Sequence, residues 1–154
     1  MRGESDPVTT AKAIVDANLY MVLGTADEDG RPWVSPVYYA PIGYHEFLWV
    51  SRPETLHSHN LAVRPEVSIV IFDSSVPIGT GQGVYMAGTA EEVTGDARVS
   101  AMEAFSRRSA EHGGGDWTVA DVEPSAELRL YRATATAHYI LGEIDRLVAV
   151  DLTR

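Results

Sequence analysis

Residues 72–91 read Phe-Asp-Ser-Ser-Val-Pro-Ile-Gly-Thr-Gly-Gln-Gly-Val-Tyr-Met-Ala-Gly-Thr-Ala-Glu. Three glycines, Gly79, Gly81 and Gly83, form a loop that leads into a predicted strand and surrounds one amide side chain, Gln82. Glycine lets a backbone or a flat ligand approach closely because it has no Cβ. An amide beside such a gap can donate and accept hydrogen bonds at once, as the edge of a heteroaromatic ring requires. A flexible hairpin loop is the alternative interpretation, and this segment by itself slightly favours it.

The segments around this loop predict short strands joined by hairpin turns. Residues 67–72 are a continuous apolar run that predicts a buried strand, and residues 82–93 predict a long strand in which Gly88 suits a bend at a barrel corner. Further strands are expected at 19–26, 31–40, 47–51, 127–141 and 146–152, and a turn at 41–44. Helices are expected at 6–17, 51–63 and 96–112. In the last of these, Val99, Met102 and Phe105 have helical spacing and predict its apolar face. The pattern indicates an α+β, mainly β class: a small antiparallel barrel with two or three peripheral helices, in a single domain over residues 1–154.

The composition excludes several classes of function. The 154 residues carry 12 basic and 22 acidic side chains, a net charge of −10, which argues against a nucleic-acid partner and against an anionic membrane. With no cysteine, disulfides, iron–sulfur clusters and thiolate zinc sites are excluded, and no metal site is predicted. No apolar run reaches membrane-spanning length and residues 1–6 lack a signal-peptide hydrophobic region, so a cytoplasmic location is expected.

The predicted junction between a strand and a helix at residues 49–61 is the first candidate site. The free N–H groups of a helix start favour an anion, and Ser51 and Arg52 add a hydroxyl and a guanidinium at that point. A run of four polar residues follows, His57 to Asn60, which suits a phosphate. The alternative is structural, because Ser51 and Glu54 have the spacing of a capping box. The segment alone leaves the two interpretations nearly even.

The strand Trp33-Val34-Ser35-Pro36 is the second candidate. Pro32 and Pro36 cannot donate to a strand ladder, so part of this strand is expected to lie at an edge or to face a gap. A planar ring with many acceptors could satisfy the remaining backbone groups. An ordinary edge strand protected by prolines is the alternative.

Taken in order, these segments resemble a known family. The ordered set is Gly30-Arg31-Pro32-Trp33-Val34-Ser35-Pro36, Trp49-Val50-Ser51, His57-Ser58-His59-Asn60-Leu61, Val67-Ser68-Ile69-Val70-Ile71-Phe72-Asp73 and Gly81-Gln82-Gly83-Val84-Tyr85. It is similar to the pyridoxamine 5′-phosphate oxidase-like, FMN-binding split-barrel family, over roughly residues 10–152. The resemblance implies an antiparallel split β-barrel and a homodimer that holds FMN at the subunit interface.

The resemblance also implies roles for individual residues. Ser51 and Arg52 fall where the family contacts the FMN phosphate, His57 and Ser58 at a second set of phosphate contacts, and Gln82 where a glutamine reaches the ring system. The full set of expected cofactor-binding residues is Trp33, Val34, Ser35, Pro36, Val50, Ser51, Arg52, His57, Ser58, Asn60 and Gln82. The arginines that flank the glutamine in the vitamin-pathway oxidases are absent here, as is their C-terminal substrate motif, so the chain is not expected to be such an oxidase.

The expected function is therefore that of an FMN-dependent oxidoreductase acting on a small molecule, in which the cofactor carries the two-electron step. A deazaflavin-dependent reductase of the same fold, or a non-catalytic flavin- or haem-binding protein, remains an alternative. No catalytic residue is assigned. Trp117 is expected in the core or at a dimer interface, with the mouth of a pocket as the alternative, and a substrate could stack near Trp117 or Tyr85. His112 is expected to be solvated.

Overall fold

The computed structural model describes residues 6–153. The strands are β1 (Tyr20–Ala26), β2 (Pro32–Tyr38), β3 (Ala40–Ile42), β4 (Glu46–Ser51), β5 (Glu66–Phe72), β6 (Gly83–Glu92), β7 (Arg129–Leu141) and β8 (Leu147–Val150). The helices are α1 (Pro7–Ala17), α2 (Leu56–Val63) and α3 (Ala97–Glu111), with 3-10 turns η1 (Val119–Val122) and η2 (Glu143–Asp145). Residues 1–5, where no signal-peptide region is expected, lie outside the described residues.

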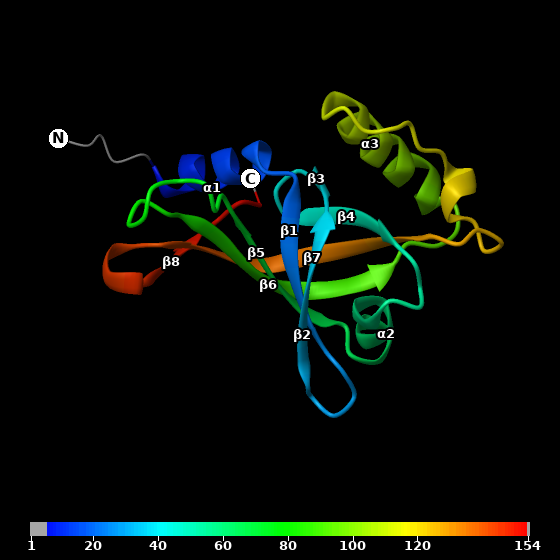
Figure 1. Ribbon diagram of the computed structural model, residues 1–154, viewed down its shortest axis with the longest axis horizontal. Coiled ribbons are helices and arrows are strands. Elements are labelled where there is room, and N and C mark those ends of the chain that lie inside the picture. The colour runs from blue at the N-terminus through cyan, green and yellow to red at the C-terminus, as the bar shows by residue number, and fades with distance from the viewer. Residues whose placement is uncertain (1–5, 154) are drawn as a thin grey trace.

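All the strands belong to one antiparallel sheet with the order β2-β1-β5-β6-β7-β4-β3, and β8 pairs with β7. The two ends of this order, β2 and β3, are separated in the chain by Tyr39 alone. The sheet must therefore curl until its opposite edges nearly meet. Figure 1 shows the result, a curled half-barrel from which the β1–β2 hairpin projects. The prediction of a mainly β, antiparallel split barrel with two or three peripheral helices is confirmed, and the described residues form three.

Tyr39 anchors the point where the edges approach. Its side chain is fully buried, its hydroxyl donates to the Val15 carbonyl at 2.6 Å, and its backbone N–H donates to the Leu19 carbonyl at 3.1 Å. The prediction of one strand over 31–40 is wrong, because β2 ends at Tyr38 and β3 begins at Ala40. The predicted turn at 41–44 overlaps β3, so the turn itself is confined to the residues around Gly43.

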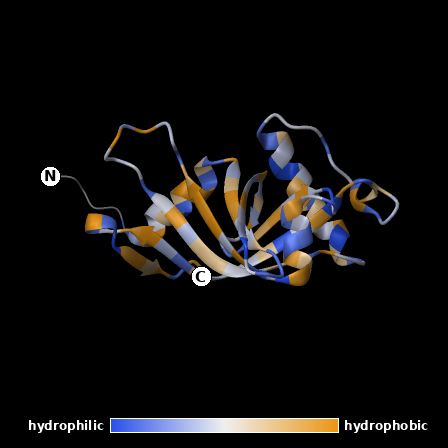
Figure 2. Ribbon diagram, turned by 60° about the horizontal axis from the view of Figure 1, so that its bottom comes forward, coloured by the Kyte–Doolittle hydropathy of each residue, from blue (hydrophilic) through white to orange (hydrophobic). Residues whose placement is uncertain are grey.

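The alternation of side chains along the strands produces two cores. Residues such as Met21, Leu23 and Trp49 fill the interior of the curl, while Leu48 and Leu130 point to the other face of the sheet, where they meet α3. Hydrophobic residues accordingly concentrate along the strands in Figure 2. The apolar run at 67–72 is buried on one face only, because Ser68 and Phe72 are exposed.

The start of α1 and one bulge follow the sequence closely. Asp6 caps α1 by accepting from the Thr9 N–H, with Pro7 in the first turn. β6 carries a register shift between Ala87 and Gly88, and a Cβ at Gly88 would collide with the Thr134 carbonyl. The expected bend at Gly88 is thus confirmed.

In α3 the expected apolar face holds for Met102 and Phe105, which are buried. It fails for Val99, which is half exposed. Val99 lies in the first turn, before the helix reaches the second core formed with Leu48 and Leu130. The apolar face therefore begins one turn later than the sequence spacing indicated.

Candidate functional site

The junction between β4 and α2 places the first group of candidate residues. Ser51 ends β4, and α2 begins only at Leu56. Thr55 caps this helix, since its Oγ accepts from the Ser58 N–H at 3.2 Å and lies 2.7 Å from the Ser58 Oγ. The predicted helix start and the possible capping box at Ser51 are therefore wrong. Since Ser51 does not cap the helix, its hydroxyl can serve a different purpose.

A chain of three side chains crosses the site from β2 to β4. The Ser35 Oγ lies 3.2 Å from His57 Nδ1, and the Ser51 Oγ lies 2.9 Å from His57 Nε2. Burial lowers the pKa of His57, because the charged imidazolium loses its hydration in this position. A neutral imidazole donates through one nitrogen and accepts through the other, so His57 connects the two serines as a relay.

Ser51 and His57 line a cavity of about 530 Å³, a volume within the usual range for small-molecule sites. Pro36 and Val50 line it as well. The rest of its wall comes from the start of β1, the end of β2, α3 and the loop after α3: Leu19, Tyr20, Val37, Tyr38, Phe105, Ser109, His112, Gly113, Gly114, Gly115 and Trp117. Among these residues, the sequence suggests a site role for Trp117 alone, as a residue at a pocket mouth. The triple glycine at 113–115 was the signal that could have identified this wall.

Arg52 lies beside the cavity, exposed to solvent. Its Nη2 forms an ion pair with the Glu127 carboxylate at 3.1 Å, and both side chains are largely exposed. An exposed pair of this kind contributes about 1 kcal/mol or less, so a stronger anion can displace Glu127. The Ser51 hydroxyl and this guanidinium can both donate to the oxygen atoms of a phosphate ester, while His57 and Ser35 orient the Ser51 hydroxyl.

Ser58 and Asn60 of the β4–α2 group point into the protein, whereas His59 is exposed. Ser58 and Asn60 are 3% and 2% exposed. Asn60 Nδ2 donates to the Thr25 Oγ at 3.1 Å, which ties α2 to β1. Neither residue lines the cavity.

The four candidate residues of β2 divide between its two faces. Ser35 is buried and joins His57, whereas Pro36 lines the cavity from the opposite face. Trp33 is about half exposed, and Val34 is exposed in a separate apolar groove on the outer face of the sheet. The expected edge position of this proline-containing strand is confirmed, because β2 ends the strand order.

Gln82 lies away from these residues. Its Nε2 donates to the Leu141 carbonyl at 2.8 Å, and its Oε1 accepts from the N–H groups of Leu141 and Gly83. Leu141 ends β7, whereas Ser51 pairs with Arg129 at the opposite end of the same strand. Within one chain, the structure does not bring Gln82 to the cavity.

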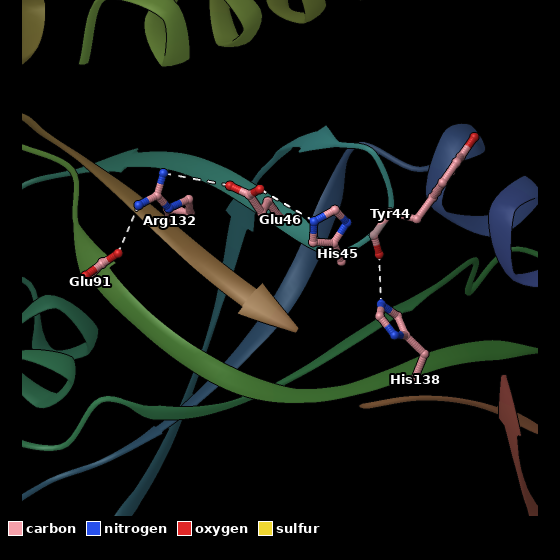
Figure 3. Close-up of polar contacts among 6 residues, drawn as sticks. All are labelled: Tyr44, His45, Glu46, Glu91, Arg132 and His138. Carbon is pink, nitrogen blue, oxygen red and sulfur yellow. Dashed lines mark hydrogen bonds and ion pairs between the residues drawn. The ribbon is translucent and has the colours of Figure 1, made fainter. Parts of the chain in front are cut away.

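Figure 3 shows another polar cluster, in which Arg132 bridges Glu91 at 3.0 Å and Glu46 at 3.7 Å, and Glu46 approaches His45 at 3.5 Å. These side chains join neighbouring strands at the sheet surface and do not line the cavity beside Ser51. Among residues 6–153, no group of three His, Asp or Glu side chains could hold a metal ion. None of the described helices is long and apolar enough to span a membrane.

Comparison with known proteins places this geometry in context. The sequence model of the family described as pyridoxamine 5′-phosphate oxidase matches residues 8–141. None of the curated proteins compared with the chain matches it.

Solved structures with the same architecture are distant in sequence. A haem-binding protein from Mycobacterium smegmatis is 21% identical with a TM-score of 0.73, over 96% of this chain and 58% of that one. HutZ, described as the haem storage protein of Vibrio cholerae, is 19% identical with a TM-score of 0.65, over 80% of this chain and 86% of that one. A structure described as an F420 reductase is 18% identical with a TM-score of 0.61, over 83% and 94%. At such identities the similarity establishes the split-barrel fold alone.

Proposed function

Because the chain belongs to the pyridoxamine 5′-phosphate oxidase family, we propose that it is an FMN-dependent oxidoreductase acting on a small molecule. The observation that carries the proposal is the cavity beside Ser51, where the Ser35–His57–Ser51 relay meets an apolar wall. When bound, FMN supplies the two-electron chemistry, and the protein supplies binding, orientation and electrostatics.

The phosphate anchor is built around Ser51. When His57 donates through Nε2 to the Ser51 Oγ, the Ser51 hydroxyl hydrogen is free to donate to a phosphate oxygen. The Ser35 hydroxyl then donates to His57 Nδ1 and holds the ring in that tautomer. Arg52 supplies a positive charge, because its guanidinium can leave the Glu127 carboxylate and pair with the phosphate instead. In this proposal the isoalloxazine ring lies beside the strand residues Trp33, Val34, Ser35 and Pro36. Val50 forms the wall next to the phosphate anchor.

A homodimer completes the site in this proposal. The outer face of the sheet carries an apolar groove of about 340 Å³, lined by Val22, Val34, Val70, Tyr85, Tyr139 and Leu147 among others. Within the described residues no helix covers this groove, so a second copy of the chain is the proposed cover. Gln82, which sits far from Ser51 in its own chain, would reach the ring from the second copy with its remaining Nε2 hydrogen. Ser58 and Asn60 support the anchor from beneath and do not touch the cofactor.

The alternatives concern the cofactor. The neighbours described as an F420 reductase and as haem-binding proteins show that this fold accommodates a deazaflavin or a haem elsewhere. Haem would need a side chain of this protein to bind its iron. Both nitrogens of His57 are already bonded, so His112, which also lines the cavity, is the candidate for that role.

The absorption spectrum of the purified protein tests the proposal. We expect flavin bands that persist through desalting, or that appear after incubation with FMN. Bands of haem or of a deazaflavin would favour the corresponding alternative, and no retained FMN at micromolar concentration would contradict the proposal. Anaerobic addition of NADH or NADPH then separates an enzyme, whose flavin is bleached, from a passive flavin binder.

A further inference from the structure

The cavity has a second half, which residues 105–117 build with Tyr20 and Tyr38. None of the predicted cofactor-binding residues comes from α3 or from the loop after it. This half therefore forms a separate compartment beside the proposed phosphate anchor.

A ladder of four aromatic rings forms one wall of the compartment. Tyr20 meets Tyr38 with a centroid separation of 6.1 Å, Tyr38 meets Phe105 at 5.6 Å, and Phe105 meets Trp117 at 5.5 Å. All three pairs are edge-to-face, the geometry that ring quadrupoles favour. The rings come from four separate segments of the chain, and Tyr20 and Trp117 at the ends retain accessible surface. The wall can therefore receive another flat ring.

Hydrogen bonds hold the loop at 113–117 against α3. The Ser109 Oγ donates to the Gly115 carbonyl at 2.8 Å, the Gly114 N–H donates to the Ser109 carbonyl at 2.7 Å, and the Trp117 N–H donates to the Ser106 Oγ at 2.9 Å. A Cβ at Gly114 would collide with the Ser109 Oγ. Glycine is therefore needed for this close packing, and the compartment is formed before any ligand arrives.

His112 provides the polar group at the rim of the compartment. Its Nδ1 lies 2.9 Å from the Arg108 carbonyl. A carbonyl only accepts, so Nδ1 carries the hydrogen, and in the neutral ring Nε2 keeps its lone pair. The C-terminus of α3, which carries the negative end of the helix dipole, lies next to His112. This rim favours a ligand that donates a hydrogen bond and disfavours an anion.

We infer that the compartment binds a small flat aromatic molecule bearing an N–H or phenolic O–H, with its ring against the ladder of Tyr20, Tyr38, Phe105 and Trp117 and its donor on His112 Nε2. The further step of calling this ligand the enzyme's substrate rests on the proposed function. Binding by the compartment does not depend on it.

Calorimetric titration with indole, 1-methylindole and indole-3-carboxylate tests the inference, with and without FMN. Indole and 1-methylindole share a ring, but only indole has an N–H. One hydrogen bond contributes about 1 kcal/mol, so we expect indole to bind roughly fivefold more tightly than 1-methylindole. The carboxylate should bind most weakly. Equal affinities for indole and 1-methylindole, or tightest binding of the carboxylate, would overturn the inference.

Matched variants locate the binding. His112→Phe should remove the preference for indole over 1-methylindole, whereas His45→Phe, remote from the compartment, should retain it. Trp117→Leu should weaken both ligands by a similar factor, and Phe72→Leu, outside the compartment, should weaken neither. An unchanged preference in His112→Phe would refute the role of its imidazole.

The same experiment separates this inference from the proposed function. If FMN binds and indole does not, the inference alone fails. If indole binds with the expected preference and FMN does not bind, the proposed function alone fails.

Discussion

Gln82 and Leu141 form a two-way hydrogen bond that ties the start of β6 to the end of β7. The Gln82 Nε2 donates to the Leu141 carbonyl at 2.8 Å, while its Oε1 accepts from the Leu141 N–H at 2.7 Å. The side-chain amide thereby behaves like the backbone of one more paired strand residue. The Gly83 N–H also donates to Oε1, at 2.9 Å, so both lone pairs of that oxygen are used.

Replacement of Gln82 by leucine should therefore destabilise the protein. The change leaves the N–H and carbonyl of Leu141 and the N–H of Gly83 without partners, a loss of about 1–3 kcal/mol in unfolding free energy. Urea unfolding measures it. Gln82→Glu keeps the acceptor and should lose less; equal stability of the Gln82→Leu variant and the unmodified protein would show that water replaces these bonds at no cost.

Substitution of Ser51 should affect the phosphate and not the ring. With Ser51→Ala we expect FMN affinity to fall roughly five- to tenfold, the equivalent of one hydrogen bond of about 1–1.4 kcal/mol, and riboflavin affinity to stay constant. Adding Arg52→Ala should abolish FMN retention while the fold persists. Flavin fluorescence quenching measures both ligands, with Ser100→Ala on the exposed side of α3 as control. A parallel loss of riboflavin affinity would remove Ser51 from the phosphate anchor.

His138 should make stability depend on pH. The ring is 4% exposed, its Nε2 lies 2.8 Å from the Tyr44 carbonyl (Figure 3), and burial lowers its pKa below the ordinary 6.5. The unfolded chain then binds more protons than the folded one, so the free energy of unfolding is highest above pH 6.5 and falls as the pH drops through the interval beneath it.

In His138→Gln the slope of unfolding free energy against pH should become shallower over that interval. It should not vanish, because buried His57 contributes with the same sign. Urea unfolding at several pH values measures the slope. A slope as steep as that of the unmodified protein would mean that His138 does not titrate between the two states.

Gly88 should resist substitution, because a Cβ there meets the Thr134 carbonyl and the backbone of Ala135. We expect Gly88→Ala to cost about 1–3 kcal/mol of unfolding free energy, the usual penalty for overpacking, measured by urea unfolding. Gly81→Ala is the matched control, because a Cβ there meets nothing within 4 Å. Equal stability of the two variants would show that the bulge can shift to make room.

Local signals in the sequence predicted most of the fold. Asp6-Pro7 indicated the start of α1, the alternation around Phe47 and Trp49 indicated β4, and Gly88 indicated the bend in β6. The errors lie where distant contacts decide between local options. Ser51 and Thr55 both qualify as helix caps, and the pairing of β4 with β7 keeps Ser51 in a strand. Tyr39 separates two strands because its ring is drawn into the core beneath α1.

Only part of the candidate site was predicted, again because contacts between distant segments bring its residues together. The grouping of Ser35, Ser51 and His57 is a long-range contact, yet all three residues belong to motifs that the sequence singled out. His112 was missed as a site residue, and for Trp117 the core or a dimer interface was preferred to a pocket mouth. Neither a solvent-exposed histidine nor a tryptophan after a glycine run indicates by itself which wall it will join.

The single residue between β2 and β3 has a consequence for synthesis on the ribosome. β4 pairs with β3 on one side, and on the other with β7, which is synthesised only after β5, β6 and α3. Until then the β3–β4 hairpin has an open edge, and the curl that Tyr39 imposes cannot close. The segment from β1 to β6 should therefore stay incompletely folded until β7 is synthesised, and closure should be a late, slow step governed by long-range contacts.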